Sequence, residues 1–289
     1  MKPLLTQGEI ETYHQRGYHL YHQQVMAADK LAALTELFEQ LQTMPVADMQ
    51  AKYAASPFDV GMDERNLAGL NQCHLWEPRL LQWLLDDEVL DLAENIVGPN
   101  IGLFSSHFIC KDPGDDVMTP WHDDRFYWQP LIEPMDKIVT VWLAIDDSTL
   151  ENGCMQVIPG SHFNDPNYEL EDYNDEKSLF SKGISEDMIN ESHAVPLEIE
   201  RGQCSLHDAR IIHGAKGNKS RKRRCGYTMR YFSTELKLLM SVKQHPTWLA
   251  RGKDIAGNDY VNRWKIPRPA YADQQMPNVK MSCLLTPLF

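Results

Sequence analysis

Long apolar runs, paired cysteines and a net positive charge are all missing from this 289-residue chain. No stretch approaches the roughly 18 consecutive apolar residues of a membrane-spanning helix. The N-terminal MKPLLTQGEIETYH has no apolar core followed by a cleavage site, so we expect no signal peptide. The 28 basic residues face 41 acidic ones, and the net charge of −13 argues against binding to nucleic acid or to an anionic membrane.

The cysteines form no Cys-x-x-Cys pair, which disfavours the common zinc and redox motifs. An even number would suit disulfides. In a large chain without a secretion signal, however, we expect free and mostly buried thiols and a reduced, cytoplasmic protein. The six residues are Cys73, Cys110, Cys154, Cys204, Cys225 and Cys283.

What is present is an ordinary globular composition, 43% hydrophobic and 24% charged, which excludes collagen-like, coiled-coil and disordered chains. A chain of this length buries about 75% of the surface that it exposes when unfolded. We expect one domain over 1–289, with a mostly helical support at 1–99, a β core at 100–235 and a C-terminal extension at 236–289.

The first third has helical patterns. A capping box at 6–9 predicts a helix that ends near Gly17, and apolar spacing predicts further helices over 27–41 and 78–97. Gly98-Pro99 is a stop signal for the last of these. A short strand is expected over 18–25, and the weakly patterned 44–70 is expected to be a loop or a frayed lid.

After residue 100 the chain consists of short runs rich in β-branched and aromatic residues, separated by turn residues. This punctuation predicts many short strands in a sandwich or barrel, and we expect an antiparallel jelly roll against which the helical third packs. The predicted strands are IGLFSSHFIC (101–110), IVTVWLAI (138–145), CMQVIPG (154–160), QCSLHDARIIH (203–213) and CGYTMRYF (225–232).

Residues 165–191 interrupt this pattern with nine acidic residues against two lysines. We expect an excursion between strands that walls a pocket. As a lid, its negative charge would disfavour a highly anionic substrate such as a coenzyme A thioester.

The segment Trp121-His122-Asp123-Asp124 suggests a metal site. If it is a strand, residues i and i+2 share a face, so His122 and Asp124 would point together and Asp123 would point away. His213, or its rival His207, would supply a second imidazole. Two histidines and one carboxylate are the facial triad of non-haem iron(II) oxygenases.

A basic segment follows His213, with six lysines and arginines between Lys216 and Arg224. Most of these belong on a solvated hairpin. One buried arginine, however, would suit the distal carboxylate of a dicarboxylate cosubstrate. Arg224 directly precedes a predicted strand, and Arg223 is the adjacent alternative.

Three segments together make the chain similar to the phytanoyl-CoA dioxygenase family over residues 5–235. They are WHDD at 121–124, VTVWLAIDDSTLENGCMQVIPGSH at 139–162 and SLHDARIIHGAKGNKSRKRRCGYTMRY at 205–231. The resemblance implies a double-stranded β-helix and an oxygenase that uses Fe(II), 2-oxoglutarate and O2. Such an enzyme hydroxylates a small-molecule substrate and releases succinate and CO2.

The resemblance also implies roles for individual residues. The iron ligands are His122, Asp124 and His213, the last favoured over His207 because Gly-x-x-x-Asn follows it. Those that touch 2-oxoglutarate are Arg224, Trp142 and, with weaker matches, His107 and Asp123. Ala215 stands where the family commonly has a hydroxyl residue.

Three alternatives remain open at the level of sequence. Desaturation could replace hydroxylation, whereas Asp124 disfavours halogenation, which requires a small residue there. The same fold could bind a metabolite or a metal without catalysis. A zinc hydrolase could also use two histidines and a carboxylate.

Overall fold

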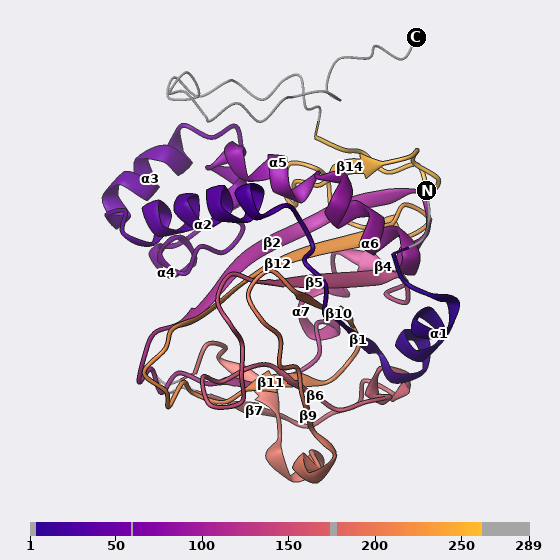
Figure 1. Cartoon of the computed structure of the whole chain (residues 1–289). Helices are drawn as coiled ribbons and strands as arrows, with labels where there is room; N and C mark the ends of the chain where they lie inside the picture. Colours follow the sequence, from indigo (N-terminus) through magenta and orange to yellow (C-terminus); the bar gives the residue numbers. More distant parts are fainter. Residues whose placement is uncertain (1–3, 59, 174–177, 262–289) are drawn as a thin grey trace.

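The computed structural model describes residues 4–58, 60–173 and 178–261, and its centre is a pair of facing antiparallel sheets (Figure 1). The larger sheet has six strands in the order β1-β10-β5-β12-β2-β14. Their bounds are β1 Tyr18–Tyr21, β10 Cys204–Asp208, β5 Ile138–Ala144, β12 Arg224–Ser233, β2 Ile101–Lys111 and β14 Trp248–Arg251.

The smaller sheet has four strands in the order β3-β11-β6-β9. They are β3 Thr119–His122, β11 His213–Ala215, β6 Gln156–Val157 and β9 Val195–Pro196. Two short antiparallel strand pairs complete the described β structure: β4 Ile132–Glu133 with β13 Lys237–Leu238, and β7 Leu170–Asp172 with β8 Lys182–Ile184. The jelly-roll prediction is confirmed.

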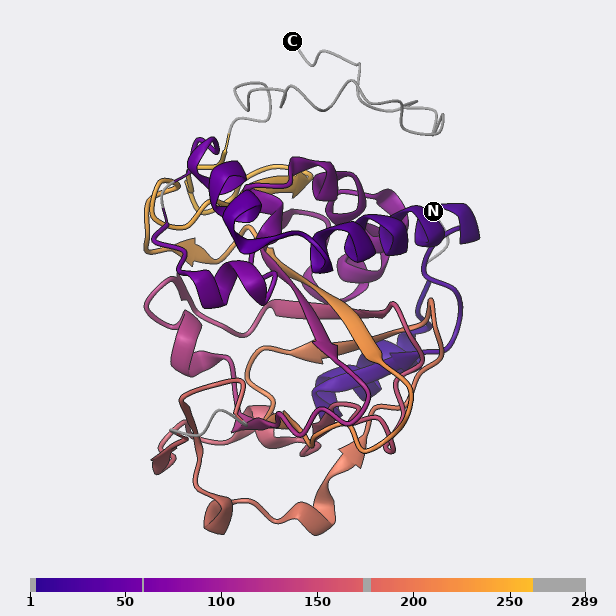
Figure 2. The ribbon, with the colours of Figure 1, turned by 90° about the vertical axis from the view of Figure 1, so that its left-hand side faces the viewer.

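Most of the helices cover the face of the larger sheet that is turned away from the smaller one (Figure 2), whereas α1 lies beside β1 and α7 follows β3 (Figure 1). The α-helices are α1 Gln7–Arg16, α2 Ala28–Gln42, α3 Val46–Ala54, α4 Glu64–Ala68, α5 Leu81–Leu84, α6 Asp87–Val97 and α7 Arg125–Trp128. The 3-10 turns are η1 Cys73–Leu75, η2 Pro78–Leu80, η3 Ser161–Phe163, η4 Glu186–Met188 and η5 Glu191–His193.

The predicted first helix is confirmed in detail. Thr6 and Glu9 form a reciprocal capping box at its start. Gly17 ends it with φ 81°, a left-handed conformation that glycine adopts without steric penalty.

The prediction of one helix over 78–97 was wrong. That segment contains η2, α5 and α6, with an interruption at Leu85 and Asp86. Asp86 has an extended backbone (φ −72°, ψ 135°), and its side chain accepts a hydrogen bond from the backbone N–H of Glu88. A local cap therefore competes with helix continuation at Asp86, although the apolar spacing runs through it.

Two further segments also differ from expectation. Residues 44–70 contain α3 and α4 instead of a loop. Residues 203–213 form β10 in the larger sheet and the start of β11 in the smaller one, so the chain crosses between sheets there. The C-terminal extension adds β14 to the edge of the larger sheet, and its remainder, 262–289 with Cys283, lies outside the described residues.

The two faces of the larger sheet bury different chemistry. On the outer face, under the helices, alternate strand residues such as Val141, Leu206 and Met229 join one apolar cluster with the helix residues Leu34 and Phe38. The inner face, toward the smaller sheet, carries the intervening residues. These are Ser105, His107, Ile109 and Lys111 on β2, Thr140, Trp142 and Ala144 on β5, Ser205 and His207 on β10, and Arg224, Gly226, Thr228 and Arg230 on β12.

Candidate metal and cosubstrate site

His122, Asp124 and His213 come together between the sheets. One ligand atom from each lies within 4.8 Å of the others, and all three residues are buried. His122 and His213 are register partners on β3 and β11, and their ring centroids are 4.1 Å apart. The smaller sheet thus places two imidazoles side by side across one strand pair.

Backbone hydrogen bonds fix the orientation of both imidazoles. Nδ1 of His122 is 2.8 Å from the Pro120 carbonyl oxygen, and Nδ1 of His213 is 2.9 Å from that of Ile211. A carbonyl only accepts, so each Nδ1 carries the proton and each Nε2 keeps its lone pair. This is the usual outer-shell arrangement of a metal-binding histidine.

Asp124 reaches the group by a different route from the one predicted. The strand β3 ends at His122, and Asp124 is the helical residue (φ −74°, ψ −12°) that precedes α7. Its backbone N–H donates to the Ala209 carbonyl at 2.9 Å. The prediction that His122 and Asp124 share one face of a strand was wrong, because a turn and not a strand brings the carboxylate to the imidazole.

Burial shifts the ionisation of the group. It lowers the pKa of His122 well below its usual range, and the neighbouring His213 adds to the effect. Burial raises the pKa of Asp124, against the opposing influence of His213 and Arg230. Two imidazoles and a desolvated carboxylate are suited to a divalent cation, which would offset the burial of Asp124, so the donor set fits a transition metal.

His207 lies near this group without joining it. Its ring centroid is 5.1 Å from that of His213, but it belongs to β10 of the opposite sheet. Asp123 also stays apart, because its carboxylate pairs with Arg125 at 2.7 Å. The metal grouping among the described residues therefore contains neither of them.

Arg224 is a buried cation at the other end of the inner face, with 1% of its surface exposed. Its Nη2 donates to the Gly153 carbonyl at 2.9 Å, while its Nε has no hydrogen-bond partner. Within the described part of the chain no carboxylate pairs with it, and burial lowers its pKa. A buried, uncompensated guanidinium is costly and is suited to an anionic ligand.

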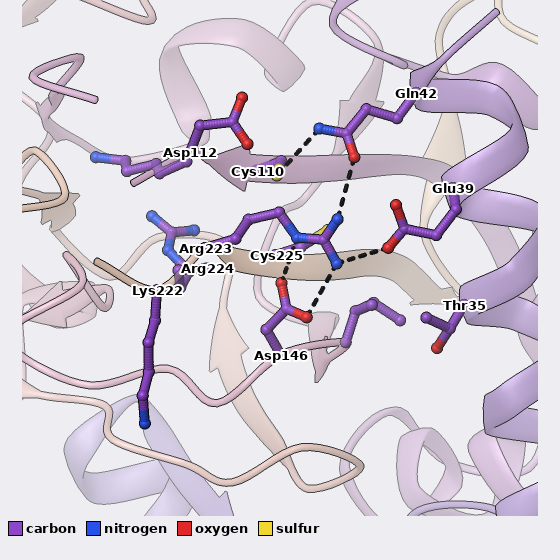
Figure 3. A network of polar contacts seen from close by, with 12 residues as sticks. Thr35, Glu39, Gln42, Cys110, Asp112, Asp146, Lys222, Arg223, Arg224 and Cys225 are labelled. Carbon is purple, nitrogen blue, oxygen red and sulfur yellow. Dashed lines mark hydrogen bonds and ion pairs between the residues drawn. The ribbon is translucent and has the colours of Figure 1, made fainter. Parts of the chain in front are cut away.

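The neighbouring Arg223 has the opposite environment (Figure 3). It pairs with Asp146 at 2.7 Å and with Glu39 of α2 at 2.7 Å, and it also donates to Gln42. These contacts satisfy its charge at the protein surface. The geometry therefore favours Arg224 over Arg223 as the arginine available to a cosubstrate.

Trp142 and Gly226 shape the space beside Arg224. The Arg224 guanidinium carbon lies 5.6 Å from the Trp142 ring centroid, and a Cβ on Gly226 would come within 2.1 Å of that ring. A side chain at position 226 would thus displace the indole. His107 lies in the same register row as Trp142, and its Nε2 is 3.0 Å from the Gly69 carbonyl oxygen.

Lys111, which the sequence interpretation missed, pairs in register with Arg224. Its Nζ donates to the carbonyls of Ala215 and Lys216, and burial together with Arg224 lowers its pKa to about 7. A lysine at the end of an apolar strand was the only signal in the sequence. Two buried basic side chains therefore lie together at this end of the inner face.

A cavity of about 280 Å³ opens next to His122. Tyr127 of α7 lines one side, and Tyr168, Lys182 and Ile184 from the 165–191 excursion line the other. The acidic excursion therefore does wall a pocket. Of the three residues of the candidate metal group, His122 lines this cavity.

Two facing antiparallel sheets with a buried pair of histidines and a carboxylate between them define a double-stranded β-helix with a candidate metal centre. The model of the phytanoyl-CoA dioxygenase family matches residues 13–226. The chain belongs to this family, as its sequence motifs predicted.

Single proteins of the same family are also similar to this chain in sequence. A phytanoyl-CoA dioxygenase domain-containing protein 1 homologue of Caenorhabditis elegans is 26% identical over 160 residues, which cover 54% of this chain and 55% of the relative. Human peroxisomal phytanoyl-CoA dioxygenase is 29% identical over 150 residues, covering 50% of this chain and 43% of the relative. The chain spans about half the length of the curated relatives that it matches.

Among solved structures, the chain is similar in fold to the non-heme monooxygenase ThoJ in its apo form. The TM-score is 0.65 at 21% identity, and the match covers 87% of this chain and 86% of that one. Separately, the described residues contain no helix long and apolar enough to cross a membrane.

Proposed function

We propose that the protein is an Fe(II)- and 2-oxoglutarate-dependent dioxygenase that hydroxylates a small molecule. The observation that carries this proposal is a buried His-Asp-His group together with a buried arginine, on the inner face of the opposite sheet, that forms no ion pair within the described residues. Membership of the family supports the same reaction class.

In this proposal each residue of the candidate site has a distinct role. His122, Asp124 and His213 would hold Fe(II), which would supply the site for the cosubstrate and O2. Arg224 and Lys111 neutralise the far carboxylate of 2-oxoglutarate, and Trp142 forms the wall beside its carbon chain. His107 and Asp123 remain candidates for weaker contacts with the cosubstrate.

The bound iron would supply the oxidising chemistry, coupled to decarboxylation of 2-oxoglutarate to succinate. The protein supplies orientation and a dry pocket. Nδ1–H of His122 and of His213 keep both imidazoles in the ligating tautomer. Because Asp124 occupies the carboxylate position, we propose hydroxylation and not halogenation.

The free buried thiols Cys73, Cys154, Cys204 and Cys225 suit a reducing cytoplasm.

The test is production of succinate by the purified protein with Fe(II), 2-oxoglutarate and O2. We expect slow succinate formation without added substrate and none in Asp124→Ala or His213→Ala. Unchanged succinate formation in both variants would contradict the site. Tight zinc with hydrolytic activity would support the zinc hydrolase instead, and a melting temperature unmoved by Fe(II) and 2-oxoglutarate would contradict any such binding.

A further inference from the structure

A row of polar residues crosses the inner face of the larger sheet beside the metal group. Arg230 on β12 pairs in register with Thr140 on β5, and Thr140 pairs with His207 on β10. Residues that pair across antiparallel strands lie on the same face with Cβ atoms about 5 Å apart. Arg230, Thr140 and His207 therefore form one continuous line, named here the polar row.

Each member of the polar row has a buried polar atom without a hydrogen-bond partner in the described part of the chain. These atoms are Nε of Arg230, Oγ1 of Thr140 and Nδ1 of His207. Buried polar groups in native proteins are nearly always hydrogen-bonded, so three adjacent exceptions call for an explanation. A bound ligand with acceptor atoms would satisfy all three groups at once.

The Arg230 side chain is held in place but not neutralised. Its guanidinium carbon lies 5.1 Å from the ring centroid of Trp128, on the helix that begins directly after Asp124. No carboxylate in the described residues forms an ion pair with Arg230. The charge of Asp124 acts on it from a distance, and burial still lowers its pKa. A divalent metal would take up the charge of Asp124 and leave Arg230 without compensation.

The polar row is separate from the Arg224 site. Six residues of extended strand, or about 20 Å, separate Arg224 from Arg230 along β12. The polar row is instead adjacent to the metal group, since the rings of His207 and His213 have centroids 5.1 Å apart. One end of the inner face thus suits the cosubstrate, and the other offers donors close to the reacting centre.

The chemistry of the row selects one kind of ligand. The flat guanidinium matches the two oxygens of a carboxylate, and a hydroxyl and an imidazole can donate further hydrogen bonds. A single cation matches one negative charge better than the two of a phosphate monoester. Near His122, Phe180 and Tyr127 lie with ring centroids 4.8 Å and 6.2 Å away, and they provide apolar walls for the rest of the ligand.

We propose that Arg230, Thr140 and His207 form a subsite for the carboxylate of the substrate, so that the substrate is a small organic acid with an apolar body. The inference rests on the proposed function, and it adds the substrate class.

The test uses 13C-labelled acetate as a minimal carboxylate probe. The protein is loaded with Mn(II), which is paramagnetic, and with N-oxalylglycine, an inert 2-oxoglutarate analogue that blocks Arg224. Relaxation of the acetate carbon then reports a carboxylate bound near the metal. We expect enhanced relaxation in the Mn(II) protein compared with the Zn(II) protein, no enhancement for acetamide, and only weak competition by inorganic phosphate.

Variants locate the probe. Arg230→Gln should weaken acetate binding about tenfold or more, as expected for loss of hydrogen bonds to a charged group, while Arg230→Lys and Thr140→Val should weaken it less. Arg223→Gln, at the surface, is the matched control and should bind as the original protein does. Equal relaxation in the Mn(II) and Zn(II) proteins, or full binding in Arg230→Gln, would overturn the proposal.

Binding of Mn(II) and of N-oxalylglycine is measured separately by electron paramagnetic resonance and calorimetry. If neither binds, the proposed function fails. If both bind and acetate does not, only the carboxylate subsite fails.

Discussion

The two faces of the six-stranded sheet are built from the same strands, but one face is mainly apolar and the other carries buried polar groups. On β5, Val141 and Leu143 point into the apolar cluster under the helices, whereas Thr140 and Trp142 point toward the smaller sheet. The outer face is mainly apolar, although the Tyr227 hydroxyl donates a hydrogen bond to Ser106 there and Nε1 of Trp248 has no partner. The inner face buries Arg224, Thr140, His207 and Arg230 with unsatisfied polar atoms. We therefore expect the outer face to contribute most of the stability and the inner face to bind the ligands.

This division has a physical origin. Apolar burial stabilises a fold by about 25 cal/mol per Å². A buried polar group without a partner destabilises it by roughly 1–3 kcal/mol. In the proposed function, a ligand would satisfy the polar groups of the inner face, so substitutions on the two faces should affect different properties.

The largest expected effect is on the metal group. His213→Ala should weaken metal affinity by more than about 100-fold, because loss of an outer-shell partner alone weakens it by about 10–100-fold and here a ligand itself is lost. His207→Ala is the matched control on the opposite sheet. Calorimetry with Mn(II) should show near-normal affinity in this control. Lost affinity in His207→Ala with normal affinity in His213→Ala would make His207 the ligand.

The next effect separates the faces within one strand. Leu143→Ala on the outer face should lower the free energy of unfolding by about 2–5 kcal/mol, since it opens a cavity in the core. Thr140→Val on the inner face should leave it unchanged or raise it by up to about 1 kcal/mol, because an unsatisfied hydroxyl is removed. Urea unfolding of the protein without metal measures both. A large loss in Thr140→Val would contradict the division of the two faces.

Adjacent arginines provide a crossed comparison. Arg224→Met should weaken 2-oxoglutarate binding by about 10–100-fold, as expected for hydrogen bonds to a charged group, without loss of stability. Arg223→Met should lower stability by up to about 1 kcal/mol, because its ion pairs are partly exposed, and should leave 2-oxoglutarate binding intact. Calorimetric titration with 2-oxoglutarate and thermal unfolding measure both variants. Weakened 2-oxoglutarate binding in Arg223→Met with normal binding in Arg224→Met would assign the cosubstrate to Arg223.

The smallest effect concerns Lys111, whose pKa burial and Arg224 lower to about 7. The folded protein releases this proton before the unfolded chain does, so the unfolded state binds more protons between about pH 7 and the ordinary lysine pKa near 10.4. Stability should therefore rise with pH across that window. In contrast, 2-oxoglutarate affinity should fall severalfold as pH rises through 7. Lys111→Met should flatten both profiles, and persistence of the slopes would point to another group.

The sequence was sufficient to predict the jelly roll, most of its strands and the three residues that the structure brings together as a candidate metal group. The sequence did not predict how residues of different strands and sheets lie relative to one another. His207 and His213 are six residues apart and would share a face in a single strand. The chain instead crosses between sheets, and the structure places them on opposite walls.

The missed residues have a common cause. Lys111 and Arg230 are isolated charges within strand patterns, and alternation does not reveal which face is dry and which is wet. Only the packing of helices on one face shows that both residues point to the other. The break at Asp86 was missed because a single side-chain cap outweighed a continuous apolar pattern.

The most direct test of the central claim is anaerobic addition of Fe(II) and then 2-oxoglutarate to the purified protein. Chelation of the metal by the keto acid produces a visible charge-transfer absorption band. We predict this band for the original protein and for Arg223→Met, its appearance only at much higher 2-oxoglutarate concentration for Arg224→Met, and its absence for His213→Ala. A protein that binds Fe(II) and shows no band at saturating 2-oxoglutarate would contradict the assignment of this site.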